Sequence, residues 1–368
     1  MILVFVLSLV GCSRRAHLRP EEVFADARAK FERGELVQAL ETSETGLQQF
    51  GQSQSIWRLR FNVLKAEILI WQGKSKESLD LLDEHQPTNY ASDEAAVRRK
   101  IIQSVDLYYL QRFDEAVESL SEAEQLATTS QPQLLGEIAS VKGRFAVVHR
   151  DFPEGQKLFS EALQIARTQN QHFLEVNALG NLGWSAMLQQ HYDEAVDWFG
   201  AASTAAQRIG NATQRVRILG NLGWCYYKLG DYERSSSIYE ESQKLAEKLG
   251  LLNDQQLRLN NIGLIRYQQR DFRGAEESYN RALEISRKLE NKSASSMALN
   301  NLAAVALESK QYDVSEQHNR EAIELERSSS DKTAIFESLI NKGRIAAGRK
   351  QYPEAEKSFQ QVIDDSGE

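Results

Sequence analysis

Apolar and polar positions along this chain repeat with a period of about 40 residues. Nine times, a short polar turn is followed by an anchor residue, and successive anchors are 38 to 40 residues apart. The anchor column consists of Leu36, Ser75, Phe113, Phe152, Tyr192, Tyr232, Phe272, Tyr312 and Tyr352. A period held along the whole chain indicates a repeat array rather than several unrelated domains.

The residues that follow each anchor predict an amphipathic helix. Three positions later every repeat has a small residue: Ala39, Ser78, Ala116, Gly155, Ala195, Ser235, Ala275, Ser315 and Ala355. Seven positions later the last six repeats have Phe159, Phe199, Tyr239, Tyr279, Asn319 and Phe359. These positions share one helical face, so we expect a second helix to approach the small residue while the aromatic ring fills the gap beside it.

A second helical pattern precedes each anchor. Its apolar column contains Leu179, Leu219, Leu259, Leu299 and Leu339. Four residues further on, the same helices carry Gly183, Gly223, Gly263, Ala303 and Gly343. Because glycine in a helix costs about 1 kcal/mol relative to alanine, its recurrence predicts close helix crossings at which a β-carbon would clash.

The polar turns between the two patterns predict antiparallel helix pairs. Three turns carry a glycine where the end of a helix needs a left-handed residue: Gly34, Gly73 and Gly230. Three others carry an aspartate where the next helix needs an N-cap: Asp151, Asp231 and Asp271.

Residues 221–232, Asn-Leu-Gly-Trp-Cys-Tyr-Tyr-Lys-Leu-Gly-Asp-Tyr, resemble the tetratricopeptide repeat. The resemblance extends over residues 21–366, and the long period is similar to that of kinesin-light-chain repeats. It implies an all-α fold, a right-handed superhelical solenoid of about nine antiparallel helix pairs. We expect divergent repeats over residues 21–135 and regular repeats over 136–368. Stacked repeats share one core, and the first helix of each pair is expected to line a concave groove.

Asparagine fills one column of these first helices: Asn181, Asn221, Asn261, Asn301 and Asn341. Asn260 and Asn300 begin a neighbouring column. An amide offers both a donor and an acceptor, and the resemblance implies that this asparagine ladder holds the backbone of a peptide or of an extended partner segment. The alternative is that repeat duplication has copied asparagines that bond to neighbouring helices.

Aromatic side chains accompany the ladder. Trp184 and Trp224 share one column, and Tyr227 and Tyr267 lie one turn further on. Such residues are frequent anchors of protein interfaces. They are also ordinary packing residues between repeats, and Trp at helical spacing favours this second role. Four polar residues lie at the rim of the same face, and their roles stay open: Arg217, Lys228, Gln268 and Arg344.

Composition and charge exclude several classes of function. The net charge of −8 and the absence of a basic run argue against nucleic-acid binding. The six histidines form no zinc-binding pattern, and neither a phosphate-binding glycine loop nor a nucleophile elbow is present. Cys225 lies on a helix expected to be packed, where cysteine behaves as a small apolar residue. We therefore predict no enzymatic activity, no catalytic residues, no metal site and no cofactor.

The first residues are strongly apolar. Residues 1–11 are typical of the apolar region of an export signal, too short to span a bilayer. Leu9-Val10-Gly11-Cys12 resembles the lipobox of bacterial lipoproteins, which implies lipidation of Cys12 and a short tether over residues 12–20. No Lys or Arg precedes Cys12, contrary to the family pattern, so an unmodified hydrophobic N-terminus is the alternative. By the same resemblance, Ser13 in place of Asp implies the outer membrane and not the inner one.

Together these features predict a scaffold, lipid-anchored at the bacterial cell envelope, that binds a protein or an extended peptide. The array would lie in the periplasm or at the surface, and the oligomeric state stays open. The sequence ends within the second helix of the ninth pair, where arrays usually carry a polar capping helix. The alternative is therefore the sensor or regulatory arm of a larger enzyme, for example one with a caspase-like CHAT peptidase domain.

Overall fold

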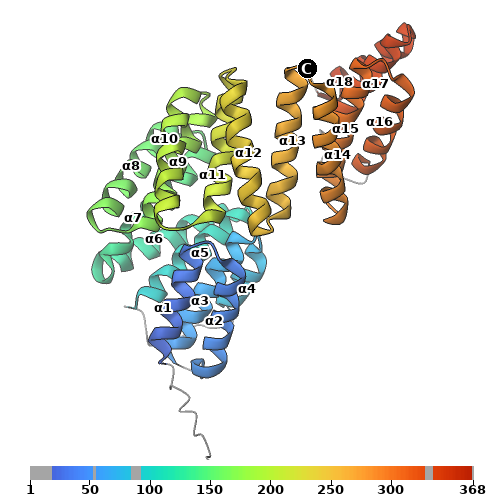
Figure 1. Ribbon diagram of the computed structural model, residues 1–368. Helices are drawn as coiled ribbons and strands as arrows, with labels where there is room; N and C mark the ends of the chain where they lie inside the picture. Colours follow the sequence, from blue (N-terminus) through green and yellow to red (C-terminus); the bar gives the residue numbers. More distant parts are fainter. Residues whose placement is uncertain (1–18, 53–54, 84–92, 328–334, 367–368) are drawn as a thin grey trace, which may run out of the picture. The chain divides into compact units, whose positions relative to one another are not determined.

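The computed structural model describes residues 19–52, 55–83, 93–327 and 335–366. These residues form eighteen α-helices and one short 3-10 helix, and they contain no strand (Figure 1). The predicted all-α repeat fold is confirmed. The chain divides into two compact units, Met1–Leu134 and Leu135–Glu368.

The first unit contains three helix pairs and the 3-10 helix. Its elements are α1 (Pro20–Glu32), α2 (Leu36–Phe50), α3 (Ile56–Trp71), α4 (Ser75–Asp83), α5 (Glu94–Tyr109), α6 (Phe113–Ser130) and η1 (Pro132–Leu134). Helix α1 begins inside the predicted tether, because Pro20 is favourable in a first helical turn, where no amide donor is needed.

The second unit contains six helix pairs. Its first helices are α7 (Leu135–Val148), α9 (His172–Leu188), α11 (Ala212–Lys228), α13 (Leu252–Gln268), α15 (Lys292–Glu308) and α17 (Ile335–Gly348). Its second helices are α8 (Phe152–Thr168), α10 (Tyr192–Arg208), α12 (Tyr232–Leu249), α14 (Phe272–Lys288), α16 (Tyr312–Glu326) and α18 (Tyr352–Ser366).

The anchor column fixes where the second helices begin. Each of the nine anchors is the first residue of the second helix of its pair. Two positions before each anchor the backbone has a positive φ, as predicted for the glycines Gly34, Gly73 and Gly230. The same conformation occurs in the other six turns at Gln111, Arg150, Gln190, Arg270, Lys310 and Lys350. Non-glycine residues adopt it at some cost, so the repeat geometry, and not glycine alone, sets this turn.

The predicted aspartate caps are confirmed. The side chain of Asp231 accepts a hydrogen bond from the backbone nitrogen of Arg234 at 3.0 Å, and Asp271 accepts one from Gly274 at 2.9 Å. Asp151 does the same at the start of α8. Each bond satisfies an amide group that has no partner within its own helix.

Glycine and aromatic residues meet where the two helices of a pair cross. A β-carbon added to Gly263 would lie 2.6 Å from Cε1 of Tyr279, and one added to Gly223 would lie 2.8 Å from Cε1 of Tyr239. Gly183 is equally close to the ring of Phe199. The rings are fully buried, so the predicted close crossing is confirmed and places the first helices at a fixed distance from their partners.

Candidate functional site

The first helices of the second unit form a continuous row. Each of them, from α7 to α17, contacts the next first helix as well as its own partner. The asparagine ladder therefore brings one amide from each of five neighbouring helices to the same register.

Three ladder asparagines bond to the preceding first helix. In each case the amide nitrogen Nδ2 donates to a residue 41 positions earlier in the chain. The bonds run from Asn181 to Ser140 Oγ at 3.0 Å, from Asn301 to Asn260 Oδ1 at 3.5 Å, and from Asn341 to the carbonyl oxygen of Asn300 at 3.1 Å. These bonds link successive repeats, as the alternative interpretation of the column expected.

The side chains of Asn221 and Asn261 differ from the other three. Both are partly exposed, and neither makes a hydrogen bond to the residues that the structure describes. The residues 41 positions earlier are Gly180 and Gly220, which have no side chain to accept a bond, and their carbonyl oxygens accept none from these amides. A β-carbon added to Gly180 would have no atom within 4 Å, so the space beside Gly180 is open.

The neighbouring column is engaged inside the protein. Asn260 and Asn300 are each only 3% exposed. Asn260 Nδ2 lies 3.7 Å from Sδ of Met297, and Asn300 Nδ2 donates to Oε1 of Glu326 at 3.0 Å. These contacts give both side chains a packing role, while the predicted role in partner binding stays a prediction.

The predicted aromatic residues are half-buried on the same helices. Trp224 stacks on Tyr227 with ring centroids 5.2 Å apart, and Nζ of Lys228 lies 5.6 Å from the Trp224 ring. Trp184, Tyr227 and Tyr267 pack against the core of the repeats. Their inner edges therefore stabilise the array, and their outer edges remain part of the surface.

Polar contacts link the aromatic residues from helix to helix. Gln268 Nε2 donates to Tyr227 Oη at 3.4 Å, from α13 to α11. Oε1 of Glu308 on α15 accepts from Tyr267 Oη at 3.2 Å and from Nη2 of Arg344 on α17 at 2.9 Å. The sequence drew attention to Gln268 and Arg344 but missed Glu308, which no column marks as special.

Arg258 on α13 is the other residue that sequence reasoning missed. Its side chain is only 5% exposed, and its Nε has no hydrogen-bond partner among the described residues. The equivalent positions in the neighbouring repeats hold Ala178, Ile218, Ala298 and Ser338. The one sequence signal that could have found it is an arginine in a column that otherwise holds small and apolar residues, because arginine is seldom placed at a buried position.

Catalytic and metal-binding chemistry finds no support in the described residues. They contain no group of three or more His, Cys, Asp or Glu side chains that could hold a metal ion. Burial raises the pKa of the Cys225 thiol to about 12, which keeps it protonated near neutral pH. The prediction that the chain is not an enzyme stays a prediction.

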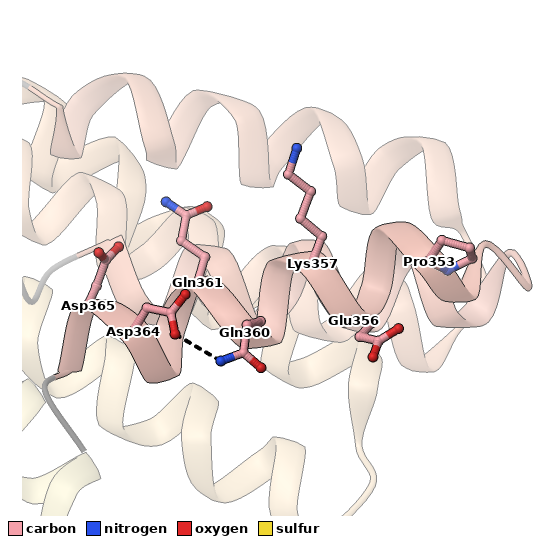
Figure 2. A pocket seen from close by; sticks show the side chains of 7 residues that line it. All are labelled: Pro353, Glu356, Lys357, Gln360, Gln361, Asp364 and Asp365. Carbon is pink, nitrogen blue, oxygen red and sulfur yellow. Dashed lines mark hydrogen bonds between the residues drawn. The ribbon is translucent and has the colours of Figure 1, made fainter.

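A hollow runs along the outer surface of α18 (Figure 2). It is lined by seven residues of that helix, among them Lys357, Gln360 and Asp364, and Gln360 Nε2 donates to Oδ1 of Asp364 at 2.8 Å. Six of its seven lining residues are polar or charged, and all seven are exposed on one helix, so nothing in it is arranged to enclose a ligand.

The membrane predictions concern residues outside the described part of the chain. Cys12, the predicted signal at residues 1–11 and most of the tether at 12–20 all lie there. Within the described residues, every helix is too short or too polar to cross a membrane.

A family model for the tetratricopeptide repeat matches residues 185–248, 256–328 and 294–365. This part of the chain is built of tetratricopeptide repeats. The match begins on α9 and covers the helices that carry Asn221, Asn261, Asn301 and Asn341. No curated protein matches the sequence.

The tetratricopeptide array is similar to solved structures. Apo RapI has a TM-score of 0.70 and 14% identity, over 83% of this chain and 86% of RapI. A Rap protein complexed with competence and sporulation factor has a TM-score of 0.59 and 15% identity, over 95% of this chain and 98% of its own. A signal transduction ATPase with numerous domains from Pyrococcus horikoshii, which has a tetratricopeptide repeat sensor, has a TM-score of 0.68 and 15% identity, over 88% of this chain and 52% of its own. At these identities the likeness concerns the fold.

Proposed function

We propose that this chain is a non-catalytic scaffold that binds an extended segment of a partner protein along the first helices of its second unit. One observation carries the proposal: Asn221 and Asn261 keep partly exposed amides that bond to no described residue, at a register where the other ladder asparagines are engaged. An amide pair of this kind matches the N–H and C=O groups of a peptide backbone. The similar Rap protein was solved in complex with competence and sporulation factor.

The aromatic surface beside these amides supports the same proposal. Trp224 and Tyr227 present stacked rings on α11, with the Lys228 ammonium group above one of them. Large, rigid side chains of this type contribute much of the binding energy in protein interfaces. The expected binding region is therefore centred on α11 and α13, not spread evenly along the array.

Selection from a randomised peptide library by the full chain tests the proposal. The double variant Asn221→Ala, Asn261→Ala should weaken selected peptides about tenfold or more, since two hydrogen bonds to the ligand are lost. The matched control is Asn181→Ala, which removes an amide already engaged with Ser140 and should change affinity little. Equal losses in both variants, or no selected peptide at all, would overturn the proposal.

We further propose that Cys12 carries a lipid that attaches the scaffold to the bacterial cell envelope, at the outer membrane. The support is the lipobox-like sequence Leu9-Val10-Gly11-Cys12, and acyl chains contribute about 0.8 kcal/mol per buried methylene. In a bacterial host, Cys12→Ala should abolish labelling by a fatty-acid probe and release the chain from membranes. Cys225→Ala is the matched control, because that thiol is buried in the array. Unchanged fractionation of Cys12→Ala would refute the anchor.

A second candidate is the sensor arm of a larger enzyme or signalling protein. The similar Pyrococcus horikoshii ATPase has a tetratricopeptide repeat sensor, and this chain spans about half of its length. The genomic sequence beyond the codon for Glu368 decides between the two candidates. An open frame with a His and Cys peptidase constellation favours the second candidate, and a prompt stop codon refutes it.

A further inference from the structure

Arg258 is a buried cation without a counter-charge. No carboxylate among the described residues forms an ion pair with it, and Asp254, one turn earlier on α13, does not come within ion-pairing distance. Burial lowers the pKa of the Arg258 guanidinium, and the neighbouring charges only partly oppose this. An uncompensated buried charge is costly, and the small or apolar residues at the equivalent positions show that the repeat does not require an arginine there.

A buried hydroxyl group lies beside the guanidinium. Cζ of Arg258 lies 5.9 Å from the centroid of the Tyr239 ring on α12. Tyr239 is 1% exposed, and its Oη also lacks a hydrogen-bond partner among the described residues. Neither Nε of Arg258 nor Oη of Tyr239 thus has a hydrogen-bond partner among the described residues, and no anion among them balances the charge of the guanidinium. A water molecule satisfies hydrogen bonds but not the charge, so the missing group is best matched by an anion.

Gly220 makes room for the guanidinium on the side of the ladder. A β-carbon added to Gly220 would lie 1.7 Å from Nη1 of Arg258 and 2.3 Å from its Cζ. One repeat earlier, the same position is Gly180, where an added β-carbon would meet open space. Gly220 itself is buried, and the Arg258 guanidinium occupies the space in which a side chain at position 220 would lie.

The two unpartnered ladder amides are close neighbours of Gly220 and Arg258 along their helices. Asn221 follows Gly220 directly on α11, and Asn261 lies three residues after Arg258, on the same side of α13. We propose, resting on the proposed function, that Arg258 pairs with the carboxylate of an Asp or Glu side chain in the bound segment while Asn221 and Asn261 hold the backbone around it. A carboxylate suits a single guanidinium because its two oxygens match the planar fork of donors.

The peptide library distinguishes this inference from the proposed function. Peptides selected by the full chain should carry Asp or Glu at one fixed position, and replacing that residue by its amide should weaken binding about tenfold or more. In Arg258→Met the ratio between the acidic peptide and its amide counterpart should fall to about one. The matched control, Arg273→Met, removes a cation that is 91% exposed on α14 and should keep the ratio.

A second variant tests the site without removing Arg258, in case Arg258→Met fails to fold. Gly220→Ala leaves the charge of Arg258 in place but displaces its guanidinium, so it should also remove the preference for an acidic residue. If peptides are selected without an acidic preference, or if Arg258→Met and Gly220→Ala keep that preference, the carboxylate site is refuted while the scaffold function stands. If the wild-type chain selects no peptide, both are refuted.

Discussion

Two neighbouring helix pairs place different residues at equivalent positions of their crossings. Where α13 crosses α14, Gly263 leaves room for the buried ring of Tyr279, and a β-carbon would come within 2.6 Å of it. Where α15 crosses α16, the equivalent positions hold Ala303 and Asn319, both buried. The smaller Asn319 leaves room for one more carbon on the facing helix. What the two positions share is therefore space: an aromatic ring stands only where the facing residue has no β-carbon.

The same rule holds along the array. Five crossings combine glycine with an aromatic ring: Gly143 with Phe159, Gly183 with Phe199, Gly223 with Tyr239, Gly263 with Tyr279 and Gly343 with Phe359. Four crossings place Ala or Ser at the glycine position and a non-aromatic residue at the other: Ala27 with Ser43, Ala66 with Leu82, Ser104 with Leu120 and Ala303 with Asn319. Three of these four belong to the first unit. The divergent repeats thus keep a small residue at the crossing but have no aromatic ring opposite it.

The largest expected effect is the loss of an aromatic ring from a crossing. Tyr279→Ala should lower the free energy of unfolding by about 3–5 kcal/mol, because a large buried side chain leaves a cavity. The equivalent change Asn319→Ala should cost about 1 kcal/mol or less, since Oδ1 of Asn319 has no partner in the described structure. Urea denaturation measures both, and similar losses would contradict the shared-volume rule.

A buried carboxylate gives the first unit a pH dependence. Asp106 on α5 is fully buried, in a column that holds Cys225, Ile265 and Val305 in the second unit. Burial raises its pKa from 3.8 to about 7, and the nearby hydroxyls of Ser75 and Ser78 offset only part of this. The folded state therefore holds the proton more tightly than the unfolded chain, so this group reduces stability as pH rises from about 4 to about 7.

Asp106→Asn should remove that loss. The variant should be more stable than the wild type by ~2–4 kcal/mol at pH 8, and the difference should shrink as pH falls towards 4. Thermal or urea unfolding of both proteins across this range measures it. A constant difference at every pH would show that the charge on Asp106 is not the cause.

Exchanging the two kinds of crossing sharpens the comparison. Asn319→Tyr alone should destabilise the chain by about 1–3 kcal/mol, because the ring meets the β-carbon of Ala303. Ala303→Gly alone should cost about 1 kcal/mol through helix propensity. The double variant should recover part of both losses and give a favourable coupling in a double-mutant cycle. Additive losses would show that the two positions do not share a volume.

The fold followed from local sequence, but the candidate site did not. The anchor column predicted every second-helix start, and the glycines predicted three of the left-handed turns, but Arg270 and Lys310 adopt the same conformation without a sequence signal. The caps Asn211 and Asn291 of first helices were also missed, although each accepts a hydrogen bond from an amide three residues later. Propensity is local, whereas these turns are imposed by the packing of the pairs.

The ladder shows why the site required the structure. The column itself was visible in the sequence, yet the role of each asparagine depends on the residue 41 positions earlier, on another helix. That residue is Ser140 for Asn181 and a glycine for Asn221 and Asn261. Only the register between neighbouring helices connects the two positions.

The smallest expected effect separates engaged from unengaged amides. Asn341 is 6% exposed and donates to the carbonyl oxygen of Asn300 at 3.1 Å, so Asn341→Ala removes a buried hydrogen bond between two helices and should cost about 1 kcal/mol. Asn221→Ala breaks no bond to a described residue and should change stability by about 0.5 kcal/mol or less. Urea denaturation compares the two. If Asn221→Ala proves as costly as Asn341→Ala, the amide at 221 is a packing residue too, and the case for a binding pair at Asn221 and Asn261 fails.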